Sequence, residues 1–319
     1  MEFELELLGY AIDVDLWDVA RKLLQALCIV TVPPIMLGLV NKTKALFGGR
    51  VGPPLLQPYY DLAKLLRKDS VFSRTTTWVF RAGPVIALVT ALLAAALVPI
   101  GPGDAILAFD GDFLVLAYLL GLSRFFTMAA ALDTGSAFEG MGAAREATFA
   151  CLAEPAFIIG LLGVARATGS ISLSGFFGPE VANVWFRSGP TFVLVAAGLF
   201  VVMLAENCRV PVDDPNTHLE LTMIHEVMVL DHGGPALGFI LYGAAVKLFV
   251  FAAMLTRLIV PIGQPAWAVW LALAGGLAAV SIAIGVVESV MARLRLTHVP
   301  AFLLAACMLC ALGVVLLVR

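Results

Sequence analysis

Long apolar runs alternate with short polar joints along the chain, and this pattern predicts most of its architecture. A helix that crosses a bilayer needs about 20 predominantly apolar residues. Eight runs have that character, near residues 22–40, 79–100, 113–132, 148–166, 190–206, 236–260, 266–287 and 299–318. We therefore predict an all-α integral membrane protein with eight transmembrane helices, in which residues 1–319 form a single polytopic membrane domain.

The first polar joint, residues 41–78, contains a shorter helical pattern in the stretch QPYYDLAKLLRKDS. Pro58 suits the first turn of a helix. Three leucines between positions 62 and 66 would share one face of that helix, whereas Asp61 and Lys64 would lie on another. This division is typical of a helix at the membrane surface, so we expect a short amphipathic interfacial helix in the joint.

Composition narrows the class of protein. The chain is 61% hydrophobic and 13% charged, which excludes an ordinary soluble domain. Its five cysteines are scattered, four of them within apolar runs, so we expect neither a disulfide framework nor an iron–sulfur cluster. The sequence has no basic stripe of the kind that would suggest a nucleic-acid partner. The N-terminal stretch MEFELELLGYAIDVD is acidic where a secretory signal is basic, so the first apolar run is expected to remain as an anchor.

The distribution of basic residues predicts an orientation in the membrane. Twelve of the 20 lysines and arginines lie in or beside the joints 41–78, 133–147, 207–235 and 288–298, against six on the opposite side. Because Lys and Arg accumulate in cytoplasmic loops, these joints should face the cytoplasm. Both termini are then expected on the outer, periplasmic side of a prokaryotic inner membrane.

Several ionisable side chains lie within or beside the apolar runs, where charge is costly. A charge at the bilayer centre costs about 2.5–3.5 kcal/mol on insertion scales, so it normally faces a partner or a polar cavity. A buried carboxylate without a cation can exchange protons near neutral pH, because burial raises its pKa. Structural ion pairs, such as Glu206 with Arg209, are the alternative interpretation. The candidate proton-path and coupling residues are Glu139, Glu154, Glu206, Asp213, Glu220, Glu226, Asp231 and Lys247.

The segment ENCRVPVDDPNTHLELTMIHE, from Glu206 to Glu226, concentrates this polar chemistry. Its THLE stretch fits a capping box, in which Thr217 caps a helix and Glu220 reaches back to the backbone. Glu220 would also share an apolar helix face, so it could cap, carry a proton, or do both. His218 and His225 are expected to exchange protons or make polar contacts. No cysteine or third histidine stands at metal-ligand spacing from them, so no metal site is expected.

Two longer motifs resemble a known family. RVGPPLLQPYYDLAKLLRKD is similar to the loop after the first helix in the quinone-site membrane subunit at the heel of complex I, the NADH dehydrogenase subunit 1/H family. AENCRVPVDD resembles the Ala-Glu-x-Asn-Arg-x-Pro-Phe-Asp stretch of that family, with Asn207 and Cys208 in shuffled order. The acidic run of quinone-reducing members is replaced here by DPNTHLELTMIHE. Together with LAEPA and AAVKLFVFA, this replacement resembles the homologous subunit of energy-converting group 4 NiFe hydrogenases and formate hydrogenlyases.

The resemblance implies a non-catalytic membrane anchor and coupling subunit of a multi-subunit oxidoreductase. It implies as partners the hydrogenase large and small subunits, an iron–sulfur protein and antiporter-like membrane subunits. The NiFe centre and the iron–sulfur clusters would belong to those partners, and this chain would bind no cofactor. The candidate docking and cavity residues are Arg50, Gln57, Tyr59, Asp61, Lys64, Arg145, Arg209, His218 and His225.

Two other functions stay open at this point. The chain could bind quinone as in NADH:quinone oxidoreductases, because the amphipathic helix and the Gln-Pro-Tyr-Tyr run leave room for a lipid-tail cavity. It could also be a stand-alone ion transporter, which would predict inverted repeats and paired broken helices. Neither of those transporter features is visible in the sequence.

Overall fold

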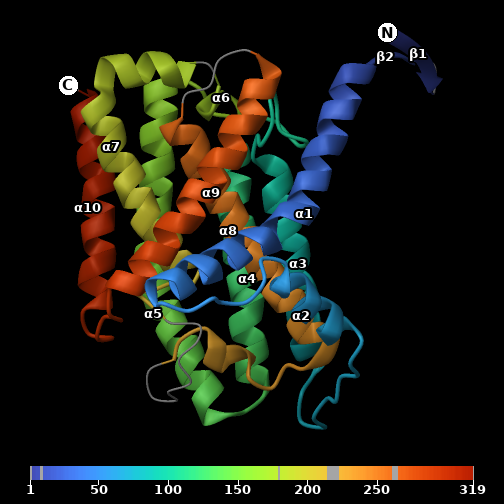
Figure 1. Ribbon diagram of the computed structural model, residues 1–319, viewed down its shortest axis with the longest axis vertical. Coiled ribbons are helices and arrows are strands. Elements are labelled where there is room, and N and C mark those ends of the chain that lie inside the picture. The colour runs from blue at the N-terminus through green and yellow to red at the C-terminus, as the bar shows by residue number, and fades with distance from the viewer. Residues whose placement is uncertain (1, 8–9, 179, 214–222, 261–264, 319) are drawn as a thin grey trace.

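The computed structural model describes residues 2–7, 10–178, 180–213, 223–260 and 265–318, and its long helices follow the apolar runs (Figure 1). Eight helices within these residues are long and apolar enough to cross a membrane, which confirms the predicted all-α integral membrane fold. They are α1 (Leu16–Phe47), α3 (Trp78–Leu97), α4 (Asp112–Asp133), α5 (Ala137–Thr168), α7 (Glu180–Glu206), α8 (Gly234–Ile259), α9 (Ala266–Val290) and α10 (Val299–Val318).

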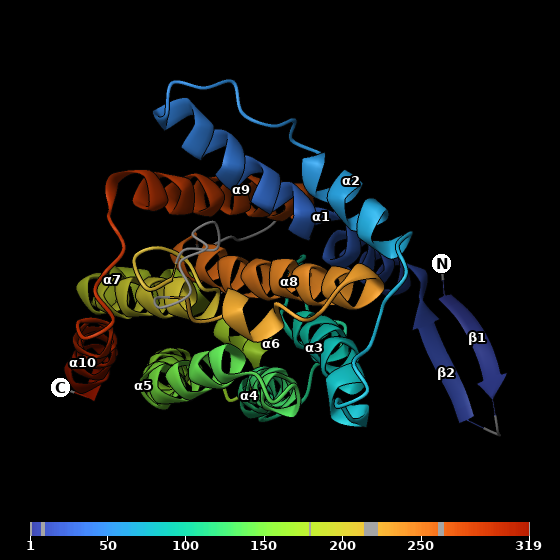
Figure 2. The ribbon, with the colours of Figure 1, turned by 90° about the horizontal axis from the view of Figure 1, so that it is seen from below.

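Helix α8 lies at the centre of the bundle. It packs against α1, α3, α7 and α9, and Figure 2 shows it between α9 on one side and α3 and α4 on the other. Two thirds of its most apolar window, 67%, is buried inside the protein. Small residues allow close approach here, as is usual between membrane helices: a Cβ on Gly243 would lie 3.4 Å from the backbone oxygen of Ala87. The side chain of Lys247, which lies on this helix, is only 17% exposed.

Helices α5, α7 and α10 form a second packed group beside α8. Helix α7 kinks at Ser188, where the backbone leaves the helical region two residues before Pro190. Proline is a usual cause of such kinks, and the predicted span started after this break, at residue 190. The short helix α6 (Leu173–Phe176) precedes α7, and its first backbone N–H donates to the Asp112 carboxylate at 2.6 Å.

The predicted amphipathic helix is present as α2 (Gln57–Leu66). It packs on α8, where Leu65 and Leu66 face Gly238, while Asp61 and Lys64 are exposed. Both termini lie at one end of the bundle, and α2 and the segment after α7 lie at the other (Figure 1). We refer to the latter as the α2 end.

A two-stranded hairpin precedes α1 and was not predicted. Strands β1 (Glu2–Leu7) and β2 (Tyr10–Asp15) pair antiparallel, with Glu2 opposite Asp15. Their sequences, EFELEL and YAIDVD, alternate polar and apolar residues with the period of a strand. A search for long apolar runs overlooks so short a pattern.

Helix α5 begins earlier than predicted, at Ala137 instead of near residue 148. Glu139, Arg145 and Glu146 therefore lie on the helix and not in a joint. The reason is that its polar first turns are covered by protein: Gly142 faces Val227, which lies in the 3₁₀ turn η1 (Glu226–Val229). Hydropathy alone cannot distinguish such a covered polar helix from a loop.

The helix expected around Glu220 is not found in the described residues. Residues 214–222, which include Thr217, His218 and Glu220, lie outside them. The part that follows forms only the single turn η1, with Met223 and Ile224 ahead of it. Both of these side chains are buried against the rest of the bundle, so tertiary contacts hold this segment without a regular helix.

Candidate functional site

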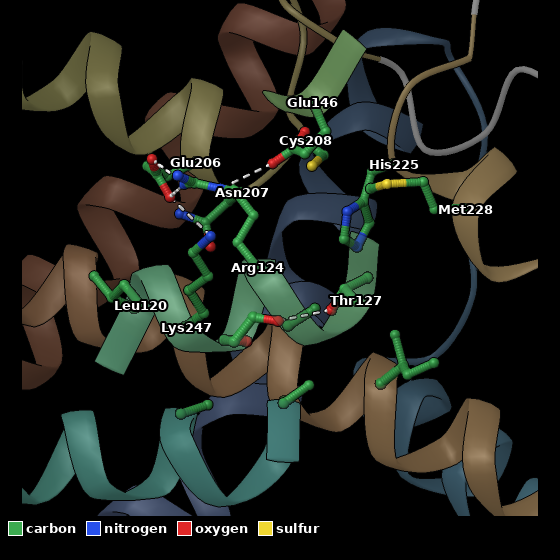
Figure 3. Close-up of a pocket in the computed structure, with 16 residues that line it drawn as sticks. Leu120, Arg124, Thr127, Glu146, Glu206, Asn207, Cys208, His225, Met228 and Lys247 are labelled. Carbon is green, nitrogen blue, oxygen red and sulfur yellow. Dashed lines mark hydrogen bonds and ion pairs between the residues drawn. The ribbon is translucent and has the colours of Figure 1, made fainter. Parts of the chain in front are cut away.

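A cluster of five charged side chains lies among helices α4, α5, α7 and α8, and Figure 3 shows four of them, Arg124, Glu146, Glu206 and Lys247. Arg124 on α4 donates to Glu206 at the end of α7 and to Glu154 on α5. Its Nε also donates to Glu146 Oε1 at 3.1 Å. Lys247 on α8 completes the group, with Nζ 2.8 Å from Glu206 Oε2. We call these five residues the Arg124 cluster.

The Arg124 cluster opposes three carboxylates with two cations. The side chains of Arg124 and Glu206 are only 6% and 4% exposed, so their charges depend on one another for stabilisation. Glu154 is different, because its side chain is 49% exposed. It lines a cavity of about 450 Å³ between α4 and α5, and this cavity also reaches Arg124 and Glu206. The cluster therefore has an opening to one side of the bundle.

A second cavity, of about 390 Å³, lies beneath α2. Its polar lining comes from several parts of the chain: Asn41 on α1, Asp61 on α2, and Arg209, Asp213 and Glu226 from the segment after α7. Ion pairs organise its wall, with Arg293 Nη2 2.7 Å from Asp213 Oδ1. Three of the predicted docking and cavity residues line it: Asp61, Arg209 and His225.

Five residues line both this cavity and a small cavity of about 80 Å³, which is also lined by Arg124, Glu146, Glu206 and Lys247 of the Arg124 cluster. Two of the five are the apolar Ile240 and Ala244, and the other three are Asn207, Cys208 and His225. We call these three residues the partition. On the cluster side, Glu146 approaches the partition, and the ligand atoms of Glu146, Cys208 and His225 lie within 4.8 Å of one another.

Burial sets the protonation of the partition. It lowers the pKa of His225, which favours a neutral imidazole, and it raises the pKa of the Cys208 thiol well above its ordinary value. Two nearby carboxylates, Glu146 and Asp213, raise the pKa of His225, but the effect of burial is larger. The partition is therefore an uncharged layer between two charged regions.

A third group of charges ties α1, the loop after α7 and α9 together. Glu288 has a fully buried side chain, and it pairs with Lys44 at 2.8 Å and with Arg209 at 3.3 Å. The ion pair suggested between Glu206 and Arg209 is therefore wrong. Each of the two takes other partners, because the turn after Glu206 directs Arg209 towards α9, while α4 and α8 supply cations to Glu206.

The remaining predicted coupling residues do not join the Arg124 cluster. Glu139 is buried at the start of α5, and its Oε1 accepts from the backbone N–H of Asp231 at 3.1 Å. Asp231 is itself exposed. Glu226 lines the cavity beneath α2, and Glu220 lies outside the described residues. Of the eight candidates, Glu154, Glu206 and Lys247 meet around Arg124.

Some of the predicted docking residues make contacts within the protein, and others are exposed. Gln57 Nε2 donates to Asp61 at 2.9 Å, and the Tyr59 hydroxyl donates to the carbonyl of Thr31, which fixes α2 to α1. Burial raises the pKa of Tyr59. Arg145 Nη1 donates to the carbonyl of Met223 at 2.9 Å and so holds the segment before η1. The other two described surface candidates are simply exposed: Arg50 and Lys64.

Sequence analysis missed the central residue, Arg124. It stands alone in the apolar stretch LLGLSRFFTMAAAL, as Glu288 stands alone in IGVVESV. A solitary charge within a spanning helix is a recognised sign of function, so both residues carried the signal. Arg293, the partner of Asp213, lies in a joint and carried no such signal.

Known proteins are similar to this chain in sequence, and one solved structure is similar to it in fold. The profile of the NADH dehydrogenase family matches residues 21–319. Formate hydrogenlyase subunit 4 of Escherichia coli strain K12 is 32% identical over 89% of this chain and 93% of that protein. Hydrogenase-4 component C of the same strain is 31% identical over 76% of this chain and 75% of that protein. A chain of the membrane-bound sulfane sulfur reductase, an archaeal respiratory membrane complex, has the same fold with a TM-score of 0.78, at 21% identity over 94% of this chain and 99% of that one.

Proposed function

Because this chain belongs to the NADH dehydrogenase family, the subunit 1/H family of complex I, we propose that it is the membrane anchor and coupling subunit of a complex I-like, membrane-bound hydrogenase of the formate hydrogenlyase type. It docks a peripheral hydrogenase arm and links electron transfer there to translocation of protons or sodium ions. Similarity to formate hydrogenlyase subunit 4 over 93% of that protein supports this choice within the family.

The observation that carries the proposal is the polar route through the bundle. It runs from the cavity beneath α2, through the partition, to the Arg124 cluster, and ends at the half-exposed Glu154 beside the cavity between α4 and α5. Charges at such a depth are costly and usually mark ion paths. In this proposal the α2 end faces the cytoplasm and receives the peripheral arm, and the chain itself performs no catalysis.

The Arg124 cluster suits an ion-coupling role because its charges do not balance. With three carboxylates and two cations, it can accept one further positive charge, either a proton or a sodium ion. Arg124 can then shift its hydrogen bonds among Glu146, Glu154 and Glu206 as that charge arrives or leaves. The hydrogen bonds of the Arg124 cluster can therefore be arranged in several ways, and an electric field from outside the cluster can favour one arrangement over the others.

Electron transfer in the docked arm would supply that field. A unit charge that appears about 10 Å from the cluster changes its electrostatic energy by roughly 1–2 kcal/mol at an effective dielectric constant of about 20. This is about one pKa unit, enough to change the occupancy of a site about tenfold.

Identification of the partners tests the assembly. The chain should be tagged in its native host, purified in mild detergent, and its co-purifying proteins identified by mass spectrometry. We expect a hydrogenase large subunit with a NiFe centre, a small subunit, an iron–sulfur protein and antiporter-like membrane subunits, with hydrogen evolution from the purified assembly. Recovery of the chain with an NADH-oxidising arm, or without redox partners, would contradict the proposal.

A quinone-binding function is the second candidate, favoured by the cavity beneath α2. Its volume of about 390 Å³ lies in the range of small-molecule sites, and Asp61, His225 and Glu226 could fix a polar head group. Quinone reduction by the purified complex that is blocked by quinone-site inhibitors would support this function. Hydrogen evolution that proceeds in quinone-free detergent micelles and resists those inhibitors would count against it.

A further inference from the structure

Glu146, Cys208 and His225 converge although they are distant in the sequence. Glu146 lies on α5, Cys208 follows the end of α7, and His225 stands directly before η1 (Figure 3). One carboxylate oxygen, the thiol sulfur and one imidazole nitrogen all lie within 4.8 Å of one another. Three different donor atoms therefore face one point at the boundary between the partition and the Arg124 cluster.

This combination of donors matches the chemistry of zinc sites. Zn²⁺ takes thiolate, imidazole and carboxylate ligands, and many sites use three protein ligands with water in the fourth position. Bond lengths of about 2.0–2.3 Å in a tetrahedral site keep ligand atoms roughly 3.5 Å apart. Side-chain rotations that move each donor atom by about 1 Å would thus bring the three donors to binding distance. The cavity of about 80 Å³ that they line has room for the water ligand.

Hydrogen bonds to neighbouring groups hold two of the three ligands, His225 and Glu146. The backbone N–H of His225 donates to Asp213 Oδ2 at 3.0 Å, and Arg293 fixes that carboxylate through its other oxygen. Arg124 Nε engages only Oε1 of Glu146, at 3.1 Å, which leaves Oε2 for an ion. Such supporting hydrogen bonds to ligands are characteristic of metal sites.

The backbone also directs Cys208 towards the other two ligands. Its φ of 52° lies in the left-handed region, which a residue with a side chain seldom adopts. This conformation turns the chain sharply after α7, while Arg209 goes on to pair with Glu288. A non-glycine residue held in this region is a frequent feature of functional sites.

The local charge permits a divalent ion. Arg124, Lys247 and Arg293 repel it, but four carboxylates attract it: Asp213 and the three of the Arg124 cluster, which include the ligand Glu146. On binding, the S–H bond of Cys208 breaks, a Zn–S bond forms, and the released proton leaves to solvent. Together, the loss of the thiol proton and the coordination by Glu146 offset much of the added charge.

We propose that Glu146, Cys208 and His225 form a binding site for one Zn²⁺ ion per chain. The site lies at the boundary between the partition and the Arg124 cluster and joins α5 to the two ends of the segment between α7 and α8. Zinc binding at this point does not depend on the proposed hydrogenase function, because it needs only the side chains of this chain.

Metal analysis of the purified complex tests the site. The complex, carrying a purification tag without histidine, is stripped with a chelator, incubated with Zn²⁺, passed through a desalting column and analysed for metal per protein. Partner subunits add their own metals, so the comparison is between variants: Cys208→Ser should lose one Zn²⁺ per complex. Cys151→Ser, which changes an exposed cysteine on α5, should lose none. Equal zinc content in the Cys208→Ser and unaltered complexes would overturn the proposal.

A second measurement needs no variant and so avoids any effect on assembly. Because burial raises the pKa of the Cys208 thiol, conditions of pH and time are first set so that a small maleimide labels both Cys208 and Cys151 without Zn²⁺. The labelling is then repeated with Zn²⁺ and followed by mass spectrometry. We expect Zn²⁺ to slow the labelling of Cys208 at least about tenfold and to leave Cys151 unchanged. Equal labelling of Cys208 in both conditions, or equal protection of both cysteines, would show that zinc binds only adventitiously. In Co²⁺-loaded complex, a thiolate-to-metal absorption band that is absent from Cys208→Ser would identify the sulfur ligand directly.

Discussion

Replacement of Arg124 by glutamine should destabilise the chain by about 3 kcal/mol. Removing one partner of a buried ion pair costs roughly 3–5 kcal/mol, because the other charge stays buried without compensation. Glu206 keeps Lys247 at 2.8 Å, which places the cost at the lower end of that range. Glu154 adds little, because its side chain is 49% exposed and exposed pairs contribute about 0–1 kcal/mol. Glu146, whose side chain is 16% exposed, bears most of the loss.

Denaturation of the complex in lipid nanodiscs measures this cost, and a double-mutant cycle assigns it. Glu146→Gln in the Arg124→Gln background should recover part of the lost stability, with an interaction energy of about 0.5–3 kcal/mol, because it removes the carboxylate that Arg124→Gln leaves unpaired. Arg295→Gln, an exposed arginine in the joint before α10, is the matched control and should stay within about 0.5 kcal/mol of the unaltered protein. An Arg124→Gln effect as small as that of the control, or two substitutions that simply add, would refute the reasoning.

Three further predictions concern other parts of the bundle. A Cβ on Gly142 would lie 2.3 Å from Val227 Cγ1, so Gly142→Ala should cost about 1–3 kcal/mol and expose the η1 segment to protease; Gly140→Ala, with its nearest neighbour at 3.9 Å, should do neither. Burial lowers the pKa of His232 to about 4, below its unfolded value of 6.5, so its contribution to stability is complete above pH 6.5 and is lost as pH falls towards 4. That loss of stability is at most about 2 kcal/mol at pH 5, and solvent screening makes it smaller. His232→Phe should therefore flatten this part of the curve of stability against pH. An unchanged curve would show that another group titrates. Glu288→Gln removes the fully buried carboxylate shared by two cations and should lower the unfolding free energy by about 3 kcal/mol; a shift below about 0.5 kcal/mol would show that this ion triad is not stabilising.

The spanning helices could be predicted because lipid imposes a simple rule. A segment must be apolar over about 20 residues to cross the bilayer, and this requirement is visible in the sequence. The amphipathic α2 could be found for a similar reason, since its two faces meet different surroundings. The early start of α5 was missed because it depends on contacts with protein and not with lipid, and the β1–β2 hairpin was missed because its alternating pattern is too short for a search for long apolar runs.

The members of the Arg124 cluster could be predicted in part. Glu154, Glu206 and Lys247 were recognised because a charge within an apolar run is conspicuous. The partner suggested for Glu206 was wrong, since the nearest cation in sequence, Arg209, turns away, and Arg124 lies on a helix 82 residues earlier. Pairing of charges across helices follows from packing, which a linear pattern does not contain.

The three proposed zinc ligands illustrate the same limit more sharply. Metal motifs are recognised by short, regular spacings between ligands, such as those of zinc fingers. Glu146, Cys208 and His225 have no such spacing, so sequence analysis expected no metal site. Only the packing of α5 against the turn after α7 and against η1 brings them together.

Ion transport by reconstituted complex tests the central claim most directly. Complexes that carry Glu206→Gln, and Asp110→Asn as an exposed acidic control, should be placed in proteoliposomes, where hydrogen turnover and ion uptake are measured together. We predict that Glu206→Gln assembles and evolves hydrogen but that its ion uptake falls to the level seen with an ionophore, while Asp110→Asn retains both. If the ratio of ions moved to hydrogen produced is the same in Glu206→Gln as in the unaltered complex, the Arg124 cluster is not the coupling element.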